Sequence, residues 1–258
     1  MTLSDSFIQS VLERIDSPDF VGVGIVGSYA RGQESKYSDV DLDLYVSKLP
    51  EDKYERYTLR YLDEKFVSLK YTLLEDEHSA FTDPRRAIWA IPGLRGMKIL
   101  IDKDGSLSAL QKAAQDFDWS RLQPAADEFA AEEVMGCAEE VHKILNGLAR
   151  GHESTVLYAT WGLVKNLLEA VAVQKGLMII SENHYFDLIQ DSVGRDSKWT
   201  RVFRTAWGLD PNASQYQARG TAALTLYRLT AAMFEDLIPE KHREVINKTL
   251  QLIKETTI

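Results

Sequence analysis

Two short segments, Gly27-Ser28-Tyr29-Ala30-Arg31-Gly32 and Ser38-Asp39-Val40-Asp41-Leu42, decide the fold of the first third of the chain. The apolar run Val21–Val26 before them is rich in β-branched residues and glycine and ends at Gly27, which predicts a buried strand. A short helix is expected over Ala30–Gln33. A sharp turn between such a strand and a helix presents backbone N–H groups to an anion, with a favourable helix dipole.

The residues of this turn suit a triphosphate. Gly27 lets the backbone approach the phosphates closely, because a side chain there would obstruct them. Ser28 offers both its hydroxyl and its amide, and the guanidinium of Arg31, one turn further along, matches phosphate oxygens. The first segment therefore predicts a nucleotide-binding turn.

The second segment predicts a metal site. From Asp39 to Val46 acidic and apolar residues alternate, which places Asp39 and Asp41 on one face of a strand with their Cα atoms about 6.5–7 Å apart. At that spacing both carboxylates reach one Mg²⁺ or a pair of them, and magnesium prefers hard oxygen ligands together with substrate phosphates. Such a metal neutralises the charge that develops on the α-phosphate during in-line displacement.

Together the two segments resemble the signature of the DNA polymerase β-type nucleotidyltransferases, and more narrowly that of the bacterial antibiotic (kanamycin, aminoglycoside or lincosamide) nucleotidyltransferases. The specific match covers residues 21–46. The alternative is an ordinary turn followed by the solvated acids of an edge strand. The resemblance implies that Asp39 and Asp41 are catalytic and bind Mg²⁺. It also implies four residues that hold the triphosphate: Gly27, Ser28, Arg31 and Ser38.

Members of this superfamily usually place a third carboxylate on a later strand, facing the acid pair. The strand expected at Phe66–Leu74 has Ser68 and Lys70 where that carboxylate would stand. Asp43 is one substitute, since it shares the face of Asp41, and a solvated acid is the alternative interpretation for it. The departure leaves room for a catalytically inactive relative that only binds nucleotide.

Two further candidates come from the second half of the chain. In the kanamycin enzyme group a glutamate of the helical domain acts as general base, with a lysine one turn further along. Glu139 and Lys143 stand four residues apart on the helix that opens the bundle, so they share a face. The resemblance makes Glu139 catalytic and Lys143 a phosphate-binding residue. A solvent-exposed salt bridge has the same spacing, and Glu140 is a competing candidate for the base.

The predicted fold class is an α+β nucleotidyltransferase domain with a mixed sheet flanked by helices, over residues 1–105, followed by an all-α helical bundle domain over residues 106–258. A helix at Ser6–Ile15 and a strand at Met97–Ile101 belong to the first domain. In the second, apolar positions from Val134 to Leu148 step by three and four, as in a bundle seam. The substrate is expected in a cleft between the domains.

Composition narrows the class of protein. The chain has 258 residues, 45% of them hydrophobic and 27% charged, which is ordinary for a globular protein. Its net charge of −9, with no basic block, argues against a large nucleic-acid footprint. No signal peptide and no apolar run long enough for a bilayer are recognisable, so no membrane partner is expected. The single cysteine, Cys137, excludes an intrachain disulfide and fits the cytoplasm.

The expected function is Mg²⁺-dependent transfer of a nucleoside monophosphate from an NTP, with ATP as the first choice, to a hydroxyl of a small molecule, releasing pyrophosphate. An antibiotic is the first acceptor to consider, by resemblance only. An antitoxin-type enzyme that adenylylates a protein is the alternative; it ranks lower because such enzymes often consist of little more than the catalytic domain. The inactive nucleotide-binding relative is a third alternative, and a homodimer is left open.

Overall fold

The computed structural model describes residues 3–15, 20–211 and 213–256. The chain divides into two compact units, which we call the sheet unit and the helical unit. The sheet unit comprises Met1–Trp119 with Met178–Glu182, and the helical unit comprises Ser120–Leu177 with Asn183–Ile258. We describe each unit by itself.

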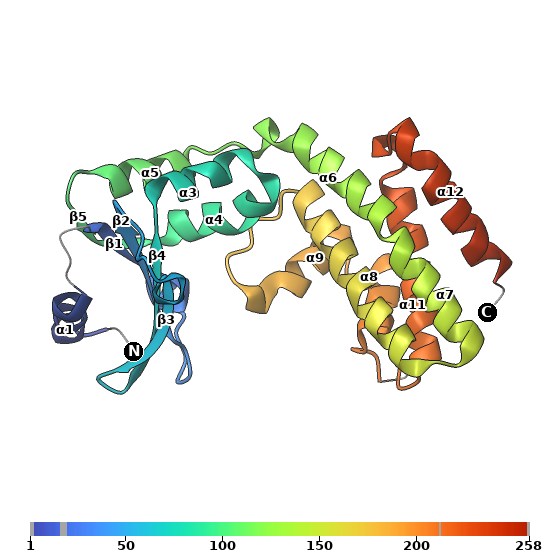
Figure 1. Cartoon of the computed structure of the whole chain (residues 1–258), viewed down its shortest axis with the longest axis horizontal. Coiled ribbons are helices and arrows are strands. Elements are labelled where there is room, and N and C mark those ends of the chain that lie inside the picture. Colours follow the sequence, from blue (N-terminus) through green and yellow to red (C-terminus); the bar gives the residue numbers. More distant parts are fainter. Residues whose placement is uncertain (1–2, 16–19, 212, 257–258) are drawn as a thin grey trace. The chain divides into compact units, whose positions relative to one another are not determined.

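A mixed five-stranded sheet forms the sheet unit, in the order β3-β4-β2-β1-β5 (Figure 1). β2 and β4 pair in parallel, and the other neighbours pair antiparallel. The predicted α+β fold with a mixed sheet is therefore confirmed. The strands span Phe20–Val26 (β1), Val40–Val46 (β2), Tyr57–Leu62 (β3), Lys65–Thr72 (β4) and Lys98–Asp102 (β5).

Helix α1 (Asp5–Ile15) covers one face of this sheet. Its residues Phe7, Val11 and Ile15 are buried in one cluster with the even-numbered residues of β2, as the alternating pattern predicts. Because Val40, Leu42 and Leu44 face this core, the acids between them face the other side of the sheet. We call that side the acid face; Asp41 and Asp43 lie on it.

On the acid face the sheet packs against α4 (Pro84–Gly96), α5 (Ser106–Gln115) and the residue between α4 and β5, Met97. The approach is close because β1 carries glycine at this point. A Cβ atom on Gly24 would collide with the side chain of Met97. Different helices thus cover the two faces of the sheet, α1 on one face and α4 with α5 on the other. The acid pair lies outside the core that α1 forms with the sheet.

The position of α5 bears on the domain boundary predicted near residue 105. The division into compact units falls at Trp119, because α5 packs on the sheet unit. Gln111 on α5 donates from Nε2 to the carbonyl of Met97 (2.7 Å), and Arg95 donates from Nε to the carbonyl of Ala114 (2.8 Å). These bonds fasten α5 to the end of α4.

Strand β3 and helix α4 of the sheet unit were not predicted from the sequence. In the structure Pro84 occupies the first turn of α4, and the carboxylate of Asp83 accepts a hydrogen bond from the Arg85 amide at 2.9 Å. Aspartate as N-cap followed by proline is a regular helix start.

The helical unit is an all-α bundle, as predicted (Figure 1). The seam expected to run unbroken from Val134 to Leu148 is interrupted at Cys137, where one helix ends and the next begins. The helices span Gln123–Gly136 (α6), Ala138–Arg150 (α7), Glu153–Gln174 (α8), Tyr185–Val193 (α9), Lys198–Trp207 (α10), Tyr216–Met233 (α11) and Glu240–Glu255 (α12).

Helix α8 lies at the centre of this bundle and packs against α6, α7, α10 and α11. By length and composition alone it could cross a membrane, with a mean hydropathy of 1.3 over its most apolar 18 residues. Within the protein 61% of that window is buried. A core helix has the same composition as a membrane span, and its burial in the bundle accounts for its apolar character.

Candidate active site

The nucleotide-binding turn predicted from the sequence joins β1 to α2, which spans Gly27–Arg31. The helix therefore begins three residues earlier than expected, at Gly27 itself. The backbone of Gly27 has φ +68°, a left-handed conformation that favours glycine. Ser28 is consequently part of the first helical turn, next to the end of β1.

The carboxylate of Asp41 packs directly on this turn. Val26 at the end of β1 pairs with Asp41 on β2, so the turn and the acid are neighbours across two antiparallel strands. A Cβ atom on Gly27 would overlap Asp41 Oδ2 and lie 3.0 Å from Asp41 Cγ. Glycine is required here for two independent reasons: the sign of φ and the space that the carboxylate occupies.

Arg31 and Ser38, the other predicted triphosphate ligands, flank the loop between α2 and β2. Arg31 is near enough to Asp41 to lower the pKa of that carboxylate, and its Nε donates to Gln33 Oε1 at 3.1 Å. The hydroxyl of Ser38 accepts a hydrogen bond from the Ser35 amide at 2.8 Å. Both side chains are partly exposed, so a ligand can reach them.

Electrostatics at the acid pair favour a cation. Burial is the main cause that raises the pKa of Asp41 to about 6, and the neighbouring carboxylate of Asp39 contributes to the same rise. A hydrogen bond from Ser68 and the charge of Arg31 oppose that rise. Two carboxylates that repel each other at a partly buried position are the donor set that a divalent cation stabilises.

The sheet register places Ser68 of β4 beside Asp41, and Lys70 beside Asp43. The third carboxylate usual in the superfamily is therefore absent from this position of β4, as the sequence indicated. Instead Lys70 Nζ forms an ion pair with Glu77 Oε1 at 3.0 Å, and Glu77, on α3 (Leu74–Ser79), is buried.

No role was predicted for Glu77 from the sequence. The residue lies seven positions beyond Lys70, and only the turn between β4 and α3 brings the two together. With Asp43 they line a pocket of about 400 Å³ on the acid face, next to Arg86 and Trp89 of α4. The run Glu75-Asp76-Glu77 gives no sign of which acid is buried.

Asp43 gives a prediction about stability. Burial raises its pKa from 3.8 to about 6, although Lys70 lowers it. The folded state therefore binds the proton of Asp43 more tightly than the unfolded state does. The resulting contribution to the free energy of unfolding is fully present below pH 3.8, is lost as the pH rises through 6, and is absent at neutral pH. We expect Asp43→Asn to raise the free energy of unfolding at pH 7.5 by about 1–3 kcal/mol. Urea unfolding at pH 7.5 and 4.5 measures the gain, which should shrink at the lower pH; an equal gain at both values would contradict this explanation.

Comparison with known proteins decides the family. Residues 7–91 match the model of the nucleotidyltransferase domain family, and this range contains the turn, the acid pair and strands β1 to β4. The sheet unit carries a nucleotidyltransferase domain. The superfamily recognised from residues 21–46, that of DNA polymerase β-type enzymes, is therefore confirmed for this domain.

Two similar proteins were found, one by its sequence and one by its fold. A curated protein of the archaeon Methanocaldococcus jannaschii, which bears the name putative protein adenylyltransferase, is 28% identical over 106 residues; the match covers 39% of this chain and 70% of that protein. The crystal structure of a nucleotidyltransferase-like protein from Exiguobacterium sibiricum superposes with a TM-score of 0.50 at 15% identity, covering 98% of this chain and 80% of that one. The second likeness concerns the fold alone.

Nucleotidyltransferase domains generally use divalent metal ions, so the donor set of this domain matters. Within residues 3–15, 20–211 and 213–256, no group of three or more histidine, cysteine, aspartate or glutamate residues is placed to hold a metal by itself. Magnesium is commonly bound by one or two carboxylates, with waters and substrate phosphates completing its shell. Asp39 and Asp41 fit that mode, with the nucleotide as part of the shell.

The remaining predicted residues, Glu139 and Lys143, lie on α7 of the helical unit. Lys143 Nζ bridges two carboxylates, at 2.9 Å from Glu139 Oε1 and 2.8 Å from Glu140 Oε1. Glu139 is 75% exposed, whereas Glu140 is 19% exposed, and its buried Oε2 has no hydrogen-bond partner among the residues that the structure describes. The hydrogen bond from Lys143 lowers the pKa of Glu139. Their role in the nucleotidyltransferase reaction stays a prediction.

Proposed function

We propose that the chain transfers a nucleoside monophosphate from an NTP, ATP in the first instance, to a hydroxyl of a small acceptor and releases pyrophosphate. One observation carries this proposal. The carboxylate of Asp41 packs against Gly27, so the predicted phosphate-binding turn and the predicted metal-binding pair form one site. Chemistry at an α-phosphate needs these two components side by side.

Each residue then has a stated task. Gly27, Ser28 and Arg31 hold the triphosphate through backbone, hydroxyl and guanidinium, and Ser38 holds it from the other end of the loop. Asp39 and Asp41 bind Mg²⁺, which on binding supplies positive charge against the phosphate oxygens of the transition state. With both sets in place the α-phosphorus is held for in-line attack, and the pyrophosphate leaves on the side of the turn.

A glutamate of the helical unit accepts the proton of the attacking hydroxyl in this proposal. Glu139 is the candidate by resemblance, with Lys143 meeting a phosphate. Glu140 is the competitor, and its partly buried carboxylate with one unpartnered oxygen supports it. Glu139→Gln and Glu140→Gln separate the two, because only the loss of the base changes the pH dependence of kcat.

Transfer of the nucleotide to a protein in place of a small molecule is a second candidate function. The name of the M. jannaschii relative favours transfer to a protein, and that relative matches 106 residues of this chain. Ser68 in place of a third carboxylate supports a third candidate, a nucleotide-binding protein without turnover. The small-molecule acceptor ranks first because the chain devotes a complete helical unit to a second domain.

We expect pyrophosphate release from ATP and Mg²⁺ in the presence of an acceptor, and its complete loss when EDTA removes the metal. Screening the four NTPs against antibiotics and other hydroxyl compounds identifies both substrates, and excess Mg²⁺ should restore the activity. Labelled ATP with a cell extract should give no labelled protein band. A labelled band would favour the protein acceptor, and Mg²⁺-dependent ATP binding without pyrophosphate release would favour the inactive relative.

A further inference from the structure

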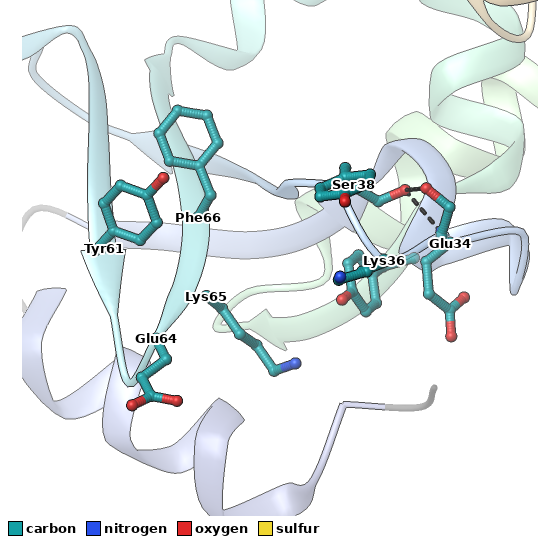
Figure 2. A pocket seen from close by; sticks show the side chains of 10 residues that line it. Glu34, Lys36, Ser38, Tyr61, Glu64, Lys65 and Phe66 are labelled. Carbon is teal, nitrogen blue, oxygen red and sulfur yellow. Dashed lines mark hydrogen bonds between the residues drawn. The ribbon is translucent and has the colours of Figure 1, made fainter.

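A second hollow of the sheet unit, which we call the hairpin pocket, lies between the β3–β4 hairpin and the loop that leads into β2 (Figure 2). Its volume is about 520 Å³, within the range of small-molecule sites. Tyr29 of α2, the loop residues Glu34–Ser38, and Tyr61 with Glu64–Phe66 of the hairpin line it. None of the roles assigned above uses this pocket, apart from Ser38 at its edge.

The hairpin pocket adjoins the acid pair on the β4 side. Asp41 pairs with Ser68, so the same register continued by two residues sets Asp39 beside Phe66, and Phe66 pairs with Tyr61 on β3. Side chains two residues apart share a face, so Phe66 and Tyr61 are on the acid face. Adjacent strands lie about 4.8 Å apart, so the pocket begins one strand away from Asp39.

The in-line geometry of the proposed reaction places the acceptor on the β4 side of β2. In the proposed function the turn after β1 holds the pyrophosphate, and β1 and β4 lie on opposite sides of β2. In-line displacement sets the attacking oxygen opposite the leaving group. The acceptor therefore arrives over β4, where the hairpin pocket is.

Two ammonium groups enter the hairpin pocket from opposite walls: Lys36 from the loop and Lys65 from the hairpin (Figure 2). Each lies over aromatic rings: Lys36 at 5.2 Å from the ring centre of Tyr37, and Lys65 at 5.8 Å from the ring centres of both Tyr29 and Phe7, the latter on α1. Neither forms an ion pair with a carboxylate in the part of the chain that the structure describes. Two lysines held in this way attract an anion.

The lining also carries two carboxylates, those of Glu34 and Glu64. Glu34 interacts with other groups of the protein. Glu64 is exposed at the hairpin tip, in a left-handed conformation with φ 63°. The aromatic rings of Tyr61 and Phe66, 5.2 Å apart, form the adjoining wall and suit a ring-shaped ligand.

We propose that the hairpin pocket is the acceptor subsite and that it recognises an anionic acceptor: a ring compound with a phosphate or carboxylate group near its reacting hydroxyl. This inference rests on the proposed function, and it refines the acceptor class. A polycationic aminoglycoside does not fit the hairpin pocket, because Lys36 and Lys65 repel it.

Inorganic phosphate is the first probe. Titrated into the ¹⁵N-labelled protein, it should produce saturable NMR shifts at the amides of residues 35–38 and of Lys65. We expect Lys36→Gln and Lys65→Gln each to raise the dissociation constant of phosphate about tenfold, because each substitution removes one charge-assisted hydrogen bond. Lys53→Gln is the matched control, since Lys53 lies over the Tyr54 ring at 5.1 Å outside the pocket and should leave phosphate binding unchanged. No saturable shift at these amides, or equal binding by all three variants, would overturn the anion site.

Repeating the phosphate titration in the presence of saturating Mg²⁺ and ATP shows whether the hairpin pocket is distinct from the site that binds the triphosphate. Phosphate should still bind in the hairpin pocket when ATP occupies the turn, whereas competition between them would assign the pocket to the triphosphate and overturn the acceptor role. Saturable shifts of the same amides with kanamycin would contradict an anionic acceptor. If ATP itself fails to bind, the proposed function fails and the acceptor role with it, while the phosphate titration still decides the anion site.

Discussion

Asp41→Asn should abolish nucleotidyl transfer and leave the fold intact. Removing one of the two carboxylates proposed to bind the metal withdraws several kcal/mol of charge stabilisation from the transition state, so we expect kcat/KM to fall at least about 10³-fold. The same substitution relieves a carboxylate whose pKa burial raises to about 6, so the protein should be no less stable at pH 7.5. A variant that is inactive yet at least as stable would separate a metal role from a structural one.

Pyrophosphate release measures the activity of the variant, and urea unfolding of the same preparation measures its stability. Asp39→Asn should have the same effect on turnover. Glu51→Gln serves as the control, because its side chain is 89% exposed and forms a surface ion pair with Lys48. Near-normal activity in either aspartate variant would refute the metal role of that residue.

Gly27→Ala should have the second-largest effect, because it acts on both halves of the site at once. The added Cβ would overlap the carboxylate of Asp41, and an L-residue at φ +68° is strained as well. We expect a loss of about 1–3 kcal/mol of stability and at least about a 100-fold loss of kcat/KM, since the displaced carboxylate no longer binds the metal at its proper place.

Gly32 provides the matched control for this substitution. It ends the same short helix with φ +67°, but an added Cβ there meets no atom within 4 Å. Gly32→Ala should therefore carry the backbone strain without the collision and keep most of the activity. Equal activity in the two alanine variants would show that the contact between Gly27 and Asp41 has no functional role.

Local patterns were sufficient to predict the centre of the sheet unit. Val40, Leu42 and Leu44 alternate with acids, and that period alone predicts which residues of β2 lie on each of its two faces. The turn and the acid pair come together because only a short helix and a loop separate two adjacent antiparallel strands. Contacts of this kind depend on neighbours in sequence, so sequence reasoning reaches them.

Elements that depend on distant partners were missed. Strand β3 is an edge strand whose Tyr57, Leu59 and Tyr61 are exposed, so it lacks the buried alternation that identifies a strand. Helix α4 contains Pro92 in addition to its first-turn proline, which obscures the helical pattern. Glu77 is buried through its ion pair with Lys70, a contact made by the fold and by no local motif.

The central claim is that Asp39, Asp41 and the turn at Gly27 form one site for a metal and a triphosphate. Calorimetric titration with ATP, with and without Mg²⁺, tests it most directly, because it requires neither the acceptor nor turnover. Saturable binding that needs Mg²⁺ in the native chain, and that Asp39→Asn and Asp41→Asn both remove, is the predicted result. Binding of equal strength without the metal, or in the two variants, would contradict it.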